Sequence, residues 1–192
     1  MRYQPDHKLE ARARLIEAAG RGFRRRGYGG IGVDGLAKEA GVTSGAFYGH
    51  FKSKDAAFEE ALLAGLEELR AAVLGMQEQH GAAWAEALVD FYLGEKRTCE
   101  LGASCALQSL TPDVQRADPA LKALFESKVK SLAAAIAQGL TGDDAQRSAK
   151  AWALIAILTG AVTLARSVDD PATADQIAAS ARSSALALVN GS

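Results

Sequence analysis

The sequence is poor in proline, cysteine and aromatic residues. Its 192 residues include 4 prolines, 2 cysteines and 6% aromatic side chains, whereas 48% are apolar. Alanine is frequent and runs of β-branched residues are almost absent, a mixture that favours helix over strand. The length fits one large domain, or a small domain joined to a larger one. We therefore expect a helical protein that can bury a core.

Long apolar runs are also missing. Residues 1–8 are polar and lack the apolar segment of a signal peptide. The longest stretch without a charged residue, 151–165, has 15 residues, short of the roughly 20 that a membrane-spanning helix needs. We interpret this stretch as a buried helix, and expect a cytoplasmic protein with no membrane partner.

The patterns typical of metal sites and common enzymes are absent as well. His7, His50 and His80 do not pair with another histidine, a cysteine or a carboxylate at metal-ligand spacing. The sequence shows no catalytic-dyad spacing and no phosphate-binding loop, so we expect no catalytic residues, no metal and no cofactor. Cys99 and Cys105 are expected to be reduced thiols, because nothing indicates export.

Charge is distributed unevenly along the chain. Residues 1–55 carry a net charge of +5 and the remainder −6, although the whole chain carries −1. A basic segment on an acidic body is typical of a protein of which only one part meets phosphate groups. This asymmetry indicates that the amino-terminal segment binds nucleic acid.

Apolar residues recur every three or four positions through most of the chain, which predicts helices. These are expected over 8–26, 33–40, 44–51, from Ser53 to about Val73, and over 82–95, 119–140, 143–167 and 171–190, with one short helix at 103–110 in a broken region 96–118. The region 33–51 consists of two short helices joined by Gly41, Val42 and Thr43. Such a unit is typical of a helix-turn-helix, whose second helix enters the DNA major groove.

The second helix of this unit has an outward face with no charged residue. Phe47 and Phe51 are expected to point into the core, whereas small residues occupy the opposite side. A bare face lets the backbone approach another surface closely, and nearby polar side chains could then bind phosphate. The residues that we expect at the DNA are Val33, Thr43, Ser44, Gly45, Ala46, Tyr48, Gly49, His50 and Lys54. A helical hairpin that uses its glycines only for packing is the alternative.

The run 41–55, GVTSGAFYGHFKSKD, closely resembles the signature of the TetR/AcrR family, and so do 36–40 and the residues Ala18, Ala19, Phe23 and Gly27-Tyr28. The resemblance implies an all-α fold with a three-helix DNA-binding domain, placed at 1–54, and a helical-bundle domain for effector binding and dimerisation, placed at 55–192. It further implies a homodimer that binds a near-palindromic double-stranded operator, usually as a repressor, and is released by a small-molecule effector.

The sequence departs from the family pattern where DNA would be read. Ser44 stands where lysine is common, Gly49 replaces a large polar residue, and Gly32 replaces the usual Thr or Ser cap. Fewer polar side chains are therefore available to contact base edges, and we expect recognition of the operator to depend more on DNA shape.

The resemblance also suggests sites in the larger domain. The expected effector pocket comprises Leu62, Leu66, Trp84, Phe91, Tyr92, Cys99, Cys105, Phe125 and Trp152, and the expected dimer interface comprises Leu154, Ile157, Leu158, Ala161, Ile177 and Ala181. The alternative for each of these residues is that it only packs in the hydrophobic core. A subsidiary hypothesis makes Cys99 or Cys105 a sensor of electrophiles or oxidants.

Two other kinds of protein remain open. An all-α enzyme or ligand-binding protein could reuse this fold, and the sparse recognition face is the reason to consider it. A ligand-independent architectural DNA-binding protein would instead have a filled core without a cavity.

Overall fold

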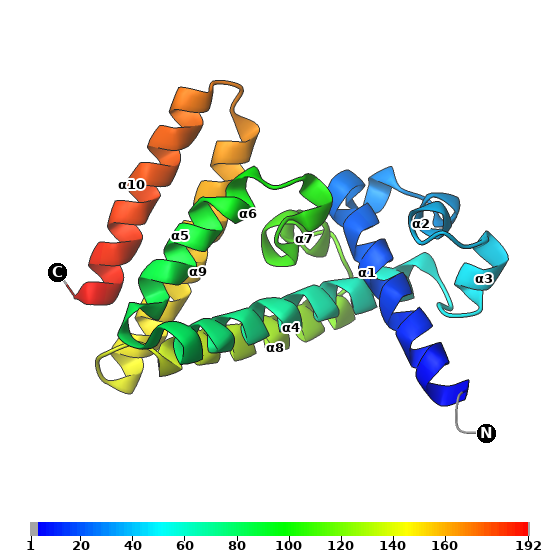
Figure 1. The fold of residues 1–192 in the computed structure, drawn as a ribbon, viewed down its shortest axis with the longest axis horizontal. Helices are drawn as coiled ribbons and strands as arrows, with labels where there is room; N and C mark the ends of the chain where they lie inside the picture. The colour runs from blue at the N-terminus through cyan, green and yellow to red at the C-terminus, as the bar shows by residue number, and fades with distance from the viewer. Residues whose placement is uncertain (1–3, 192) are drawn as a thin grey trace. The chain divides into compact units, whose positions relative to one another are not determined.

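A computed structural model describes residues 4–191 (Figure 1). Its regular elements are all helices, joined by short turns. The helices are α1 (Gln4–Gly30), α2 (Val33–Glu39), α3 (Ser44–Tyr48), α4 (Lys54–His80), α5 (Trp84–Leu93), α6 (Glu95–Thr98), α7 (Ala106–Val114), α8 (Pro119–Gln138), α9 (Asp144–Ser167) and α10 (Pro171–Asn190), with short 3₁₀ turns η1 (Gly81–Ala83) and η2 (Leu101–Ala103). These residues contain no strand, which confirms the all-α prediction.

Several predicted boundaries are wrong. Helix α1 does not stop at Arg26 but continues to Gly30, with a kink at Gly27, whose φ is +69°. Helix α4 does not end near Val73 but continues through Gly75 to His80, because an isolated glycine weakens a helix without ending it. The helix expected at 103–110 begins only at Ala106, because Cys105 has an extended backbone, and it then runs past Pro112.

The described chain forms two compact units. Unit 1 comprises Met1–Gly65 and Leu101–Phe125, and unit 2 comprises Leu66–Glu100 and Glu126–Ser192. Helices α4 and α8 contribute residues to both. This division follows spatial contacts, so the predicted functional boundary between residues 54 and 55 stays a prediction.

Aromatic rings form the core of unit 1. Phe23, Phe47, Phe51 and Phe58 are all at most 2% exposed. The Phe23 and Phe58 rings meet edge to face at 5.1 Å between centroids, and Phe47 and Phe51 lie 4.8 Å apart. Burying each such side chain contributes roughly 1.5–3 kcal/mol, so these rings hold the first four helices together.

Helix α1 is also bonded to the segment that begins at η2. The Arg24 Nε donates to the Gly102 carbonyl at 2.7 Å. The kink at Gly27 takes the next N–H out of the helical pattern, and the Tyr28 N–H donates to the Asp113 Oδ2 of α7 at 3.0 Å. The two bonds fasten the last turns of α1 to η2 and α7.

Unit 2 is organised around α9 and α10, which pack against each other and against α5. Asp143 and Gln146 form a capping box at the start of α9, and Asp170 caps α10 ahead of Pro171. Arg182 of α10 bonds both Glu86 and Asp90 of α5, at 2.9 and 2.6 Å. These carboxylates raise the pKa of Arg182, and the guanidinium ties α10 to α5.

Helix α9 is less buried than we predicted. Among the described helices it has the length and apolar composition that could cross a membrane, a test that core helices of water-soluble proteins also pass, and 33% of its most apolar window is buried. Ala151, Leu154 and Leu158 face inward, whereas Trp152 is 42% exposed and Leu164 is 60% exposed. The interpretation of 151–165 as a buried helix therefore holds for one side of α9, whereas another apolar side is left uncovered.

Candidate nucleic-acid interface

Helices α2 and α3 form the helix-turn-helix that the sequence predicted. Gly41 has φ +68°, the left-handed conformation that lets the chain turn sharply after α2. The Val42 N–H then donates to the Ala37 carbonyl at 2.9 Å. Thr43 caps α3, since its hydroxyl accepts from the Ala46 N–H at 3.2 Å. The turn is thus closed by its own hydrogen bonds and does not depend on DNA.

The two faces of α3 differ as predicted. Phe47 is buried on the inner side, and Phe51 just beyond the helix is buried with it. Gly45, Ala46 and Gly49 are exposed on the outer side, next to Tyr48, which is 55% exposed. The outer face carries no charge and little side-chain bulk, so a flat or grooved partner can come close to the backbone.

The remaining predicted contact residues surround this face. Val33 and His50 are half-buried, at the start of α2 and just after α3. Lys54 opens α4, with its Nζ 4.1 Å from the centre of the Tyr28 ring. That ring restricts the lysine to one side of unit 1 and leaves its charge available to an anion.

An acidic residue that we did not predict also belongs to the site. The Ser44 hydroxyl donates to the Asp34 Oδ1 at 2.5 Å, which joins the first turn of α2 to the first residue of α3. Both residues lie at the surface, and Asp34 is exposed. Residues ten positions apart on separate helices carry no common periodic signal, so no pattern in the sequence indicated this pair.

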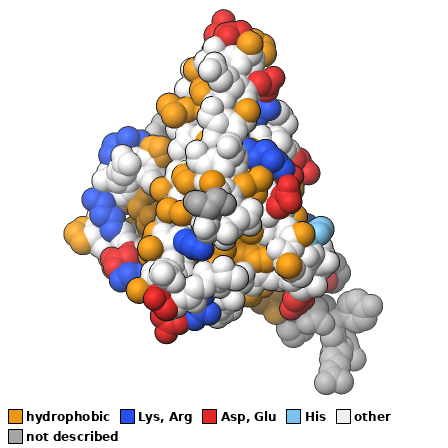
Figure 2. All heavy atoms as spheres, turned by 90° about the vertical axis from the view of Figure 1, so that its left-hand side faces the viewer, with side chains coloured by type: hydrophobic (Ala, Val, Ile, Leu, Met, Phe, Trp, Pro, Cys, Tyr) orange, Lys and Arg blue, Asp and Glu red, His pale blue; other side chains and the backbone are white. Residues whose placement is uncertain are grey.

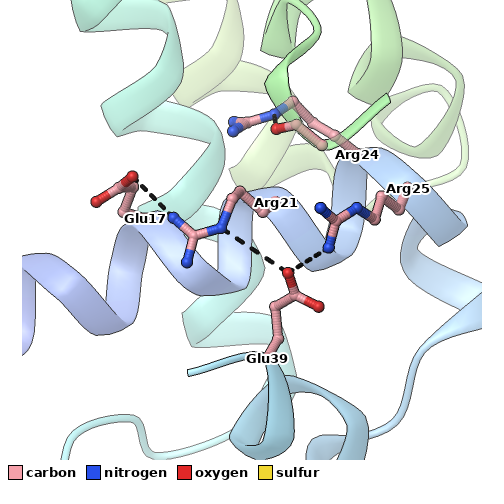
Figure 3. Close-up of polar contacts among 6 residues, drawn as sticks. Glu17, Arg21, Arg24, Arg25 and Glu39 are labelled. Carbon is pink, nitrogen blue, oxygen red and sulfur yellow. Dashed lines mark hydrogen bonds and ion pairs between the residues drawn. The ribbon is translucent and has the colours of Figure 1, made fainter. Parts of the chain in front are cut away.

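Ion pairs set the position of α2 against α1. Glu39, at the end of α2, is contacted by Arg25 at 2.5 Å and by Arg21 at 3.8 Å (Figure 3). Arg21 also contacts Glu17 at 2.7 Å, within α1. Figure 3 shows Arg24 directed instead to the other side, where it meets the η2 segment. Successive arginines of α1 therefore hold the helix-turn-helix on one side and η2 on the other.

The environment of Tyr28 perturbs its ionisation. Its phenol donates a short hydrogen bond to the Asp55 carboxylate, at the start of α4. This bond, helped by burial and by the negative charge of Asp55, raises the pKa of Tyr28 from 10.0 to about 12. Tyr28 is thus a neutral donor at ordinary pH and links the end of α1 to the start of α4.

The residues predicted to line the effector pocket differ in burial, and whether they line one pocket stays a prediction. Leu62, Leu66, Trp84, Tyr92 and Cys105 are buried, Phe91, Cys99 and Phe125 are half-buried, and Trp152 is exposed. In unit 2, a cavity of about 490 Å³ between α8 and α9 is lined by Trp152, Lys130 and Arg147 among others. In unit 1, a cavity of about 420 Å³ is lined by Tyr28, Asp55, Phe58 and Asp113 among others. These two cavities include only Trp152 of the predicted set.

The predicted dimer-interface residues fall into two groups. Leu154, Leu158 and Ala161 are buried within the protomer, whereas Ile157, Ile177 and Ala181 are half-buried. The exposed apolar residues of this region are instead Trp152, Leu164 and Val168. Figure 2 views the molecule from the side where α9 and α10 lie in Figure 1, and shows apolar side chains in orange among many uncharged ones.

The two cysteines are free and have different surroundings. Cys105 is buried before α7, and Cys99 is half-buried after α6. The Arg166 Nη2 lies 3.2 Å from the Cys99 Sγ and donates to the Cys99 carbonyl at 2.9 Å. Cys99 therefore lies directly beside a cationic group. Among the described residues, no group of three or more His, Cys, Asp or Glu could hold a metal ion.

The amino-terminal region matches a known family. Residues 15–61 match the model described as bacterial regulatory proteins, tetR family. The HTH-type transcriptional regulator TtgR of Pseudomonas putida is 43% identical over 68 residues, which cover 35% of this chain and 32% of that protein. The uncharacterised HTH-type transcriptional regulator YdgC of Bacillus subtilis is 41% identical over 54 residues, 28% of each chain. The aligned part thus spans about a third of these relatives.

Solved structures share the fold over nearly the whole chain. SCO4454, a TetR-family transcriptional regulator from Streptomyces coelicolor, superposes with a TM-score of 0.75 at 20% identity, covering 95% of this chain and 96% of that one. The reduced form of E. coli NemR gives a TM-score of 0.72 at 18% identity, covering 91% and 96%. At such identity the likeness establishes the fold, and the helix-turn-helix with the helices after it is the fold of these regulators.

Proposed function

Because residues 15–61 match the model of the TetR family of bacterial regulatory proteins, we propose that the chain is a cytoplasmic, dimeric regulator of transcription of this family and not an enzyme. Its amino-terminal helices bind a near-palindromic operator, and a small effector bound elsewhere in the chain changes that affinity. Repression is the mode of regulation that we expect.

The uncharged outer face of α3 is the observation that carries this proposal. Exposed Gly45, Ala46 and Gly49 let the α3 backbone enter the major groove closely, and Tyr48 projects beside them. Lys54 and His50 flank the face and can bind phosphate groups. The net charge of +5 on residues 1–55 attracts the DNA backbone more generally. Neither catalysis nor the binding of a small ligand requires an uncharged, exposed helix next to a basic segment, whereas DNA binding makes use of both.

The uncovered side of α9 supports dimerisation. Trp152 and Leu164 are large apolar side chains on that side, and Gly160 between them is exposed, with nothing within 4 Å of the place where its Cβ would lie. Small residues allow two helices to approach closely, and large ones at either end then bury apolar area. We propose that a second copy packs here, which would present two α3 helices to successive major grooves.

Two cavities support effector binding. Each is large enough for a small molecule. Their presence favours a ligand-responsive regulator over a purely architectural DNA-binding protein.

A second, thiol-based response is favoured for Cys99 over Cys105. Cys99 is the less buried of the two thiols, and the Arg166 Nη2 donates to its Sγ at 3.2 Å, so a group attached to this sulfur would meet the guanidinium. Alkylation of Cys99 would also disturb the Arg166 bonds to the Lys96 and Cys99 carbonyls. Cys99→Ser should abolish any effect of alkylating agents on DNA affinity, whereas Cys105→Ser should preserve it. Unchanged affinity of the fully alkylated wild type would remove the hypothesis.

Selection of binding sites from a random double-stranded DNA pool tests the main proposal. We expect a near-palindrome whose half-sites are about one helical turn apart, bound with a steep dependence on salt. Ala46→Glu, which places a charge and bulk on the outer face, should abolish binding without changing the unfolding temperature. Ala123→Glu, at an exposed position of α8 outside both cavities, is the matched control. The proposal fails if the wild type enriches no sequence.

A further inference from the structure

We propose that Asp34 is a specificity-determining residue that accepts a hydrogen bond from the amino group of a cytosine in each operator half-site. The inference rests on the proposed DNA-binding function. It starts from the bond between Ser44, the first residue of the recognition helix, and the Asp34 Oδ1 at 2.5 Å. The first residues of a recognition helix contact base edges, so a carboxylate bonded to one of them lies where the bases are read.

The bond determines which groups this corner of the surface offers. Because the Ser44 hydroxyl proton points to Asp34, the serine oxygen is left as an acceptor. An ionised carboxylate only accepts, and the second oxygen of Asp34 remains for another donor. The side chains of Asp34 and Ser44 therefore present acceptors without a donor, and a group on DNA that bonds to these side chains must supply the proton.

Few groups on a duplex can do so. Phosphate oxygens, guanine O6 and N7, and thymine O4 are all acceptors, and a carboxylate next to any of them is repelled. In the major groove the donors are the amino groups of cytosine and adenine. Adenine carries the acceptor N7 beside its amino group, whereas cytosine does not, so cytosine is the better partner for a carboxylate.

Asp34 lies in the first turn of α2, where a negative charge favours the helix, and its bond to Ser44 also holds that charge beside the recognition helix. Residues 40–51, from the end of α2 through α3, include no Asp, Glu, Lys or Arg. A carboxylate that approaches a polyanion without a bonded donor weakens binding to every sequence. Asp34 thus weakens binding to most DNA and contributes to binding only where an amino group meets it.

The experiment compares binding-site selections and dissociation constants for the full-length protein and two Asp34 variants. Wild type should require cytosine at one position of each half-site and lose roughly tenfold or more in affinity when that base pair is replaced. Asp34→Ala should lose this preference and bind random-sequence DNA more tightly. Asp34→Asn should shift the preference toward adenine, because an amide pairs with the adenine N6 and N7.

Control variants separate base reading from charge and folding. Asp169→Asn removes one exposed negative charge in the turn between α9 and α10, and should leave both the preferred sequence and the affinity unchanged. Ser44→Ala keeps the carboxylate but removes its bond, and should weaken the cytosine preference without creating one for adenine. Thermal unfolding of each variant shows whether the fold is intact.

The possible outcomes are distinct. If wild type enriches no sequence, the proposed function itself fails. If it enriches an operator, and both Asp34 variants enrich the same operator with the same base preferences, the role of Asp34 in specificity is overturned. A uniform loss of affinity for all sequences, with a lower unfolding temperature, would assign Asp34 to helix stability alone.

Discussion

Tyr28 shows how much a single residue can connect in this protein. Its backbone N–H donates to Asp113, its phenol donates to Asp55, and its ring meets both Lys54 and Phe58. Helices α1, α4 and α7 therefore meet at one residue. The hydrogen bond to Asp55 needs the phenol proton, so its contribution depends on pH.

We predict that Tyr28 makes unfolding sensitive to pH above 10. Its pKa is raised from 10.0 to about 12 in the fold, so the stabilisation is complete below pH 10 and is lost as pH rises toward 12. Tyr28→Phe should be less stable than wild type at neutral pH and should show a shallower decline over this range. Denaturant unfolding at a series of pH values measures the difference.

Spectrophotometric titration provides the control for this prediction. The late-ionising component of wild type should include Tyr28, and Tyr28→Phe should reduce its amplitude by one tyrosine. Tyr48→Phe, which changes a phenol that is 55% exposed, should leave that amplitude unchanged. An undiminished late component in Tyr28→Phe would contradict the shift.

The hydrogen bond between Asp34 and Ser44 could not be predicted from the sequence, unlike the burial of single residues in their own helices. Phe47 was predicted to be buried, because its burial follows from its position in its own helix. The Asp34–Ser44 bond depends on how two helices cross and on side-chain rotamers. Neither is encoded in local periodicity.

At the scale of elements, two glycines of α4 should respond in opposite ways to alanine. A Cβ at Gly65 would lie 2.5 Å from the Ala106 Cβ of α7, whereas nothing lies within 4 Å of one at Gly75. Gly65→Ala should cost about 1–2 kcal/mol, because overpacking outweighs the gain in helix propensity. Gly75→Ala should gain roughly 0.5–1 kcal/mol. Urea unfolding tests both, and similar effects would contradict the close approach of α4 and α7.

The position of the helix-turn-helix against α1 should depend on Glu39. Glu39→Gln weakens the contacts with Arg21 and Arg25 and should lower stability by roughly 1 kcal/mol, with weaker operator binding. Glu17→Gln breaks only an exposed pair within α1 and should change stability by less than about 0.5 kcal/mol. Equal effects of the two variants in unfolding and gel-shift assays would argue against a role of Glu39 in holding α2 on α1.

The helices themselves could be predicted because their apolar residues recur at helical spacing, but several ends could not. Helix α4 was expected to reach only about Val73 and continues to His80, since a single glycine at position 75 lowers helix propensity without ending the helix. The broken region 96–118 holds α6, η2 and α7, which are too short to show a clear period.

At the scale of the whole molecule, association of two chains should depend on Leu164. Leu164→Glu places a charge on the uncovered side of α9 and should convert the dimer to a monomer with much weaker operator binding. Leu124→Glu, on α8, changes a leucine that is 40% exposed and should leave the dimer intact. Sedimentation equilibrium measures the mass of each. A dimeric Leu164→Glu protein would place the interface elsewhere.

The predicted interface residues show why assembly is difficult to infer from a sequence. Leu154, Leu158 and Ala161 share a helical face with apolar neighbours, and the pattern identified that face. Since α9 is apolar on more than one side, periodicity could not tell which side packs within the protomer and which meets a partner. That distinction needs the positions of α5 and α10.

The recognition helix α3 has five residues, far fewer than a helix needs to be stable alone in water. Its order comes from Phe47 and Phe51, which are anchored in the aromatic core of unit 1. A genetic screen for loss of operator binding should therefore recover substitutions of these inward-facing rings as often as substitutions on the outer surface. Some alleles of the first kind should regain activity at low growth temperature.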